Sequence, residues 1–196
     1  MAIRVDRTAI VSLGLSCQVT HQITSNLPLI ASLTGADPQS MTTPFDWNIC
    51  PAQSAARMIR DWRFYPEDPA SLVVDLTPYW PEIPCWFYHD AERLEAGTFL
   101  SREAHLAENL ERVQEAERQV FILANTQKNL TNVARRVVHP MSFIFKDRDI
   151  NALRAALAAR LPNGADVISG LRGIGSPTLE AWPRIELGYA DLQSAA

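Results

Sequence analysis

The sequence predicts an α/β fold, a single domain over residues 1–196 with three layers and a mostly parallel sheet. Short apolar runs typical of buried strands alternate along the chain with runs whose apolar residues recur at helical spacing. The chain has 196 residues, of which 47% are hydrophobic, and this is enough to build one core. The alternation favours parallel strands joined by helical crossovers.

The opening unit is a predicted strand, a turn and a helix. The strand covers Thr8–Leu13, a short and partly β-branched apolar run that ends at Gly14. From Cys17 onward apolar residues recur at helical spacing, and Pro28 is expected to end the helix. The turn between these two elements therefore carries Gly14 and Cys17.

The rest of the chain supplies further elements around a segment rich in turn-forming residues, 34–47. Helical spacing predicts helices over Pro51–Trp62, Ser101–Glu117, Asn129–Val138 and Asp149–Leu161. Continuous apolar runs predict strands over Gln119–Asn125, Met141–Phe145 and Ala165–Leu171. Between about 62 and 90 prolines alternate with aromatic residues, which predicts an irregular segment, either an ordered covering loop or a set of short strands.

Charge and cysteine content exclude several classes of partner. Lysine and arginine number 18 against 22 acidic residues, a net charge of −4 without a long basic block, so we expect no nucleic-acid partner. The three cysteines form no close pair, so neither a disulfide framework nor a zinc site is expected, and no cofactor. Unpaired cysteines are typical of a reducing compartment, so we expect a cytoplasmic protein. We expect no membrane partner, since no run approaches the length of a membrane span. An export signal ending at Cys17 is the weaker alternative.

Cys17 is the first candidate for chemistry. It follows the first predicted strand and precedes a helix, where backbone N–H groups and the helix dipole favour the thiolate. The same N–H groups and the side chain of Gln18 are placed to hold an oxyanion, and Gly14 allows a tight turn. The alternative is that Cys17 is a small buried apolar residue, as most free cysteines are.

A thiolate nucleophile needs a base, and the chain has four histidines. His21 lies one helical turn after Cys17, His105 belongs to a charged helix and is expected to be solvated, and His139 precedes a proline in a loop. His89 follows an aromatic run and precedes Asp90, which places an acidic neighbour beside it. The alternative for His89 is a structural histidine within the aromatic segment.

Three separated motifs carry a resemblance to a known family. "SLGLSCQVTHQI", then "TPFDW", then "FYHD" resemble the signature of a bacterial family of papain-like cysteine peptidases, most clearly over Ser12–Trp47. The resemblance implies Cys17 as nucleophile and His89 as base, with Asp90 or Asp46 orienting the histidine. It also implies that Ser12 and Gly14 shape the turn, and a papain-like α+β fold is the alternative fold class.

Other interpretations of these residues stay open. Asn125 would complete the papain order of catalytic residues, which is cysteine, histidine and then asparagine, or it belongs to a helix cap. Asp46 has a structural alternative in which it caps a turn while Phe45 and Trp47 pack in the core. Cys17 and Asn125 also occupy positions like those of functional residues in small α/β hydrolases of the SGNH class, which act on acyl groups of glycans.

The sequence thus predicts a cysteine-dependent hydrolase or acyl-transfer enzyme. The expected substrate is a peptide or isopeptide bond, or an acyl group on a glycan or a carrier. The second hypothesis is a binding module without catalysis, whose aromatic segment takes a carbohydrate or a protein. The sequence leaves the oligomeric state open.

Overall fold

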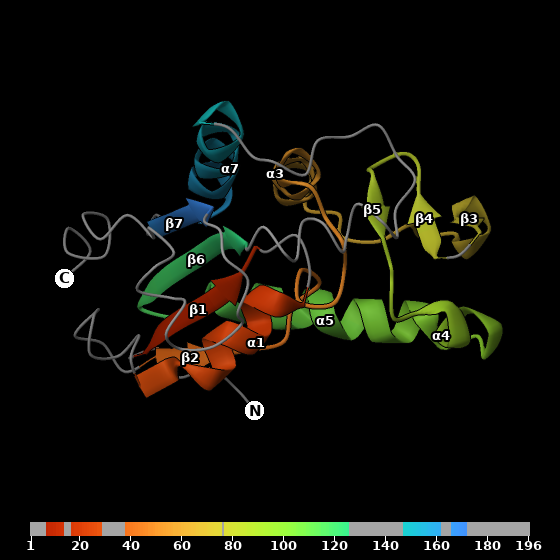
Figure 1. The fold of residues 1–196 in the computed structure, drawn as a ribbon, viewed down its shortest axis with the longest axis horizontal. Helices are drawn as coiled ribbons and strands as arrows, with labels where there is room; N and C mark the ends of the chain where they lie inside the picture. Colours follow the sequence, from red (N-terminus) through yellow and green to blue (C-terminus); the bar gives the residue numbers. More distant parts are fainter. Residues whose placement is uncertain are drawn as a thin grey trace.

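The computed structural model describes residues 7–13, 17–28, 38–75, 77–125, 147–161 and 166–171. They contain both helices and strands (Figure 1). The strands are β1 (Thr8–Ser12), β2 (Pro38–Ser40), β3 (Val73–Val74), β4 (Pro78–Trp80), β5 (Cys85–Trp86), β6 (Arg118–Asn125) and β7 (Asp166–Leu171). The helices are α1 (Gln18–Ser25), α3 (Ala52–Asp61), the 3₁₀ turn η1 (Pro69–Ser71), α4 (Ala91–Glu95), α5 (Phe99–Val113) and α7 (Asp147–Arg160).

Four strands form a parallel sheet in the order β2-β1-β6-β7. All five residues of β1 are buried, as expected for a strand inside a parallel sheet. The chain goes from β1 to β2 on one side and later returns to place β6 on the other side of β1. The strand order therefore reverses between β1 and β6, and in open parallel sheets ligands bind outside the carboxyl ends of the strands at such a point.

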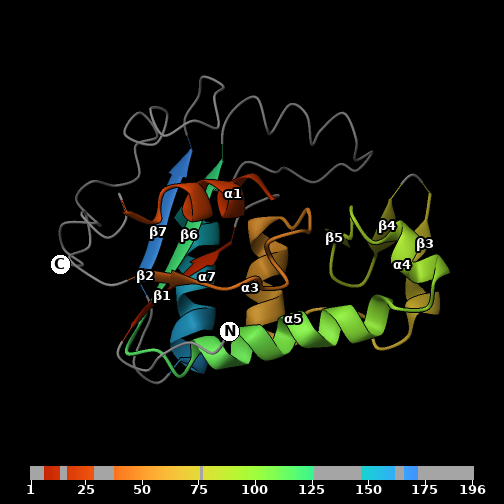
Figure 2. The same ribbon diagram turned by 90° about the horizontal axis from the view of Figure 1, so that it is seen from below.

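Helices α1 and α7 contact different strands of this sheet. Helix α1 contacts β1 and β6, and α7 contacts β7 and α3. Helix α5 runs from the small β3-β4-β5 region back to the start of β6 (Figure 2). The prediction of helices mixed with a parallel sheet is confirmed.

The aromatic, proline-rich segment contains a second, antiparallel sheet of order β3-β4-β5. Both figures place this small sheet away from the parallel one, towards the end of α5 that is next to α4. An antiparallel bridge between Ile49 and Trp86 attaches the 41–50 segment to β5, with hydrogen bonds of 2.9 and 3.0 Å. This bridge brings the segment containing "PFDW" next to the strand that leads to His89.

Several boundaries differ from the sequence predictions for identifiable reasons. The turn-rich 34–47 segment contains β2, because proline is tolerated at the first residue of an edge strand. Helix α5 begins at Phe99 and not at Ser101, whose hydroxyl donates to the Thr98 carbonyl within the first turn. The predicted helix Asn129–Val138 and strand Met141–Phe145 lie outside the described residues.

Helix α5 carries a carboxyl group into the interior. Glu103 is fully buried, and one of its oxygens accepts a hydrogen bond of 2.5 Å from Arg102. Burial, followed by the nearby charge of Asp90, raises the pKa of Glu103 from 4.5 to about 7. The folded protein therefore binds a proton at Glu103 over a pH range in which the unfolded chain has released it.

This difference predicts a pH-dependent stability. Because the folded pKa is the higher one, the contribution of Glu103 is fully present below about pH 4.5 and is lost as the pH rises towards 7. Glu103→Gln should remove a loss of up to about 3 kcal/mol over that range. Urea unfolding of wild type and variant at a series of pH values measures the difference in slope. Equal slopes would contradict the assignment.

Candidate active site

Cys17 lies immediately before α1, where it is the N-cap residue, and follows the carboxyl end of β1. Its thiol is reduced and half-buried. The amide of His21 donates to the Cys17 carbonyl at 3.1 Å, which is the first hydrogen bond of the helix. The amides that precede His21 in α1 have no carbonyl partner within the helix, and the first turn holds no acidic residue. Cys17 thus lies at a positive helix end.

The other two cysteines have a different environment. Cys50 and Cys85 are fully buried, and they face each other next to the Ile49–Trp86 bridge. Burial, together with the contact with Cys50, raises the pKa of the Cys85 thiol well above its ordinary value. Cys85 is therefore a protonated, inaccessible thiol, and the exposure of Cys17 sets it apart.

Asp46 connects α1 to the "PFDW" segment. Its carboxylate accepts hydrogen bonds from the Thr20 hydroxyl and from the Thr43 amide, while its own amide donates to the Thr43 carbonyl at 3.1 Å. Burial raises the pKa of Asp46 from 3.8 to about 6, against the opposing effect of these hydrogen bonds. Asp46 holds the turn at 43–46 against the helix that begins beside Cys17.

The aromatic residues on either side of Asp46 point to different surroundings. Phe45 is buried and makes an edge-on contact with Phe64, with ring centroids 5.8 Å apart. Trp47 is 36% exposed, so the expectation that it packs as a core anchor is wrong. Its ring instead lies edge-on to His89, with centroids 5.7 Å apart. The turn of Asp46 therefore directs one ring into the core and the next towards His89.

His89 lies between β5 and α4 and is exposed. Its ring contacts Trp47 on one side and makes an edge-on contact with Tyr88, with centroids 4.9 Å apart. Its carbonyl accepts a hydrogen bond of 2.6 Å from Arg93. The structure thus brings the second and third motifs into direct contact and joins the first to the second through Asp46.

Asp90 is completely buried and is held by two arginines. Arg93 donates to it at 2.7 Å, and Arg102 approaches one oxygen at 3.2 Å and the other at 3.4 Å. Asp90, the carboxylate expected to orient His89, thus forms ion pairs with two arginines. Sequence reasoning missed both arginines, although the spacing of Arg93 three residues after Asp90 is a signal for such a pair.

A cavity of about 560 Å³ opens beside His89. Its lining includes Trp47, His89, Arg93, Arg102, His105 and Asn109. The Asn109 amide donates to the Thr42 carbonyl at 3.0 Å, which fixes the start of the "PFDW" segment to α5. His105 is 62% exposed, as the charged helix predicted. The cavity therefore lies where the second motif, the third motif and α5 meet.

The remaining predicted site residues are placed as follows. Asn125 is the last residue of β6, at the carboxyl edge of the strand that pairs with β1. Gln18 is the first residue of α1, Ser12 is the buried last residue of β1, and His21 is exposed on α1. Gly14 and His139 lie outside the described residues. Asn125 therefore ends β6, and Cys17 follows the neighbouring strand β1, at the carboxyl edge of the sheet.

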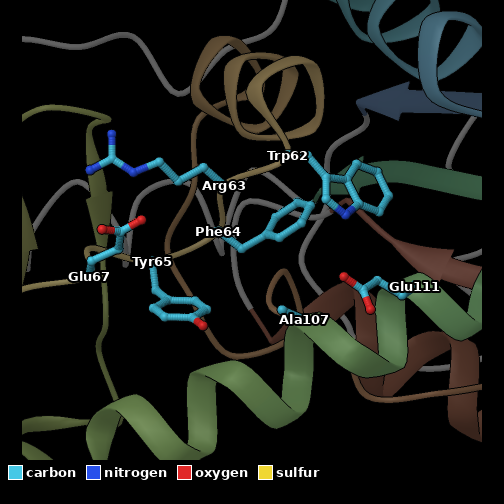
Figure 3. Close-up of a pocket in the computed structure, with 7 residues that line it drawn as sticks. All are labelled: Trp62, Arg63, Phe64, Tyr65, Glu67, Ala107 and Glu111. Atoms are coloured by element: carbon cyan, nitrogen blue, oxygen red, sulfur yellow. The ribbon is translucent and has the colours of Figure 1, made fainter.

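A second, smaller cavity of about 190 Å³ lies in the aromatic segment (Figure 3). Its walls include Trp62, Phe64 and Tyr65, together with Glu67 and Glu111. Trp62 adopts a left-handed conformation at the end of α3, and the Arg160 guanidinium lies 6.0 Å from its ring centroid. The aromatic segment thus lines a cavity of its own.

Among the described residues, no group of three or more histidine, cysteine or acidic side chains is arranged to hold a metal ion. In the same part of the chain, no helix combines the length and the apolar character needed to cross a bilayer.

The hydrogen bond from Thr20 to Asp46 predicts a measurable loss of stability. Thr20→Val leaves a buried carboxylate with one donor fewer and should cost about 1–3 kcal/mol in the free energy of unfolding. Thr24→Val is the matched control, because that exposed hydroxyl bonds only a backbone carbonyl and its loss should cost less than about 0.5 kcal/mol. Equal losses in urea unfolding would show that Asp46 does not connect the two segments.

The burial of the cysteines predicts selective alkylation. In the native protein, iodoacetamide should modify Cys17 and leave Cys50 and Cys85 unmodified, because the latter are inaccessible. All three should react in denaturant. Peptide mass spectrometry locates the modification, and native labelling of Cys50 or Cys85 before Cys17 would contradict the structure.

Comparisons of the chain with protein-family models, with curated proteins and with solved structures find no match.

Proposed function

We propose that this protein is a cysteine-dependent hydrolase or acyl-transfer enzyme, with Cys17 as the nucleophile and His89 as the group that moves the proton. The substrate is a peptide or isopeptide bond, or an acyl group on a glycan or carrier. The proposal includes a three-layer arrangement with helices on both faces of the sheet, supported by the contacts of α1 with β1 and β6 and of α7 with β7.

One observation carries the proposal. Among the three cysteines, Cys17 is the one that is not buried, and it lies at a helix N-terminus beside the point where the strand order of a parallel sheet reverses. A thiol at such a position meets unpaired backbone N–H groups that stabilise the thiolate. The same groups are suited to stabilise an oxyanion on an attacked carbonyl.

The proposed reaction has two steps. The Cys17 thiolate attacks the acyl carbon, the tetrahedral intermediate collapses to a thioester, and the leaving group takes a proton from the His89 imidazolium. Neutral His89 then accepts a proton from water or from an acceptor hydroxyl, whose oxygen attacks the thioester and releases the thiolate. The path from α1 through Asp46 to Trp47 and His89 supports a shared site.

In this proposal Asp46 and Asp90 are positioning residues. Asp46 accepts hydrogen bonds from Thr20 and Thr43, and Asp90 pairs with two arginines. Both carboxylates therefore hold neighbouring elements of the site in position. Asn125 is the amide expected near the oxyanion. The pairing of β1 with β6 supports this, since both strands end at one edge.

The location we propose is the cytoplasm. The three cysteines are free thiols, and a reducing compartment keeps such thiols from forming disulfides.

A second candidate function is favoured by the aromatic cavity. Three aromatic walls and two carboxylates are typical of sites that bind carbohydrates, so a binding module without catalysis would use this cavity. The two candidates differ in their dependence on Cys17. A binding module predicts a thiol with the ordinary reactivity of a free cysteine.

The test is the rate of Cys17 alkylation by iodoacetamide as a function of pH. The proposal predicts labelling of wild type near neutral pH, its complete loss in Cys17→Ser, and in His89→Ala a shift of the reactive form to a pH higher by about one unit. The matched control is His21→Ala, which removes an exposed imidazole outside the proposed pair and should leave the profile unchanged.

Two results would contradict the proposal. A pH profile in wild type equal to that of a free cysteine would indicate a structural thiol. A shift in His21→Ala that is as large as that in His89→Ala would assign the effect to α1 itself and remove His89 from the mechanism.

A further inference from the structure

Two arginines that pair with the same buried carboxylate line the cavity beside His89. Arg93 comes from α4 and Arg102 from α5, and both donate to the buried carboxylate of Asp90. Asp90 is the N-cap residue of α4, three residues before Arg93, and Arg102 reaches it from α5. One carboxylate thus fixes two guanidinium groups from different helices beside one cavity of about 560 Å³.

The arginines use one nitrogen each for their anchors. Within the described part of the chain, Nη1 of Arg93 bonds Asp90 and the His89 carbonyl, and Nη1 of Arg102 bonds Asp90 and Glu103. The contacts of both groups are therefore at Nη1. This leaves Nε and Nη2 of two fixed guanidinium groups as donors for a further acceptor.

The charge of the cavity wall has one sign. Its described lining includes two arginines and two histidines and no carboxylate. Asp90 lies completely buried behind the arginines, and Arg93 and Arg102 are 40% and 18% exposed. Beside them, Trp47 offers an exposed aromatic surface. The combination is typical of a site for an anion that is attached to an apolar or ring-shaped body.

We propose that this cavity binds an oxyanion of the substrate, a carboxylate or phosphate group, through Arg93 and Arg102, with the adjoining part of the substrate against Trp47. The statement that the ligand is a substrate rests on the proposed function, while the binding itself does not. His89 is adjacent to the proposed anion site, so the reactive acyl group of a bound substrate lies a short distance from its anionic end.

The test uses phenyl phosphate and benzoate as the two oxyanion probes, and phenol as the neutral control, each titrated into the wild-type 196-residue chain by calorimetry. We expect one saturable site for at least one oxyanion and none for phenol. Tighter binding of phenyl phosphate assigns the site to phosphate, and tighter binding of benzoate assigns it to carboxylate. Absence of saturable binding by both would overturn the proposal.

Variants locate the site. Arg93→Gln should weaken binding about tenfold or more, because a charge-assisted contact is lost. Arg112→Gln on α5 removes the same charge outside the cavity and should leave affinity within about twofold, which controls for attraction by net charge. Equal effects of the two variants would overturn the site. Circular dichroism verifies that each variant is folded.

A measurement on unmodified protein covers the case in which Arg93→Gln does not fold. Phenylglyoxal should modify Arg93, and the probe that binds should protect it while Arg112 stays reactive. If phenylglyoxal modifies Arg93 equally fast with and without a saturating concentration of the probe, the proposed anion site is wrong. Two results together would keep the anion site and reject the catalytic function. The probe would bind Cys17→Ser with wild-type affinity, and Cys17 of the wild-type protein would react with iodoacetamide like a free cysteine.

Discussion

The hydrogen bonds of the buried Asp46 carboxylate are the interaction on which the candidate site depends. A carboxylate inside a protein needs donors, and here the donors come from α1 and from the turn at 43–46. This requirement fixes the helix that begins beside Cys17 against the segment that leads to β5. With the turn held, Phe45 enters the core and Trp47 reaches the ring of His89. Asp46 thus joins the first motif to the second, while the Ile49–Trp86 bridge joins the second to the third.

Asp90 is a second buried carboxylate that holds neighbouring elements together. It is buried among Arg93, Arg102 and the raised-pKa carboxyl of Glu103, and its single charge is shared between two guanidinium groups. Both acidic residues of the resemblance thus act as anchors of neighbouring elements. The consequence is a cavity wall that carries two arginines and, among its described residues, no carboxylate, a distribution that favours anionic ligands.

The local pattern of the sequence was enough to predict the long elements. Continuous apolar runs predicted β1, β6 and β7, and helical spacing predicted α3, α5 and α7, because each of these elements buries a regular set of side chains. The short strands β2 and β4 could not be predicted in this way. They consist of three residues each and contain proline, so their pairing depends on neighbours distant in the sequence.

The site was predictable in its residue types and not in their contacts. The strand-to-helix turn indicated Cys17, and the resemblance indicated Asp46, His89 and Asp90. These carboxylates accept hydrogen bonds from Thr20, Arg93 and Arg102. Each donor lies on a helix, at a position where the sequence pattern is equally compatible with a side chain exposed to solvent. Only the packing of α1, α4 and α5 decides which of these polar residues meet.

The proposed mechanism requires an acyl-enzyme at Cys17, and this species can be trapped. The protein is mixed with p-nitrophenyl acetate, quenched in acid and measured by intact and peptide mass spectrometry. We predict transfer of one acetyl group to the Cys17 sulfur with release of p-nitrophenolate, and no such adduct in Cys17→Ser. An acetyl group found only at other residues, to the same extent in wild type and Cys17→Ser, would contradict the account.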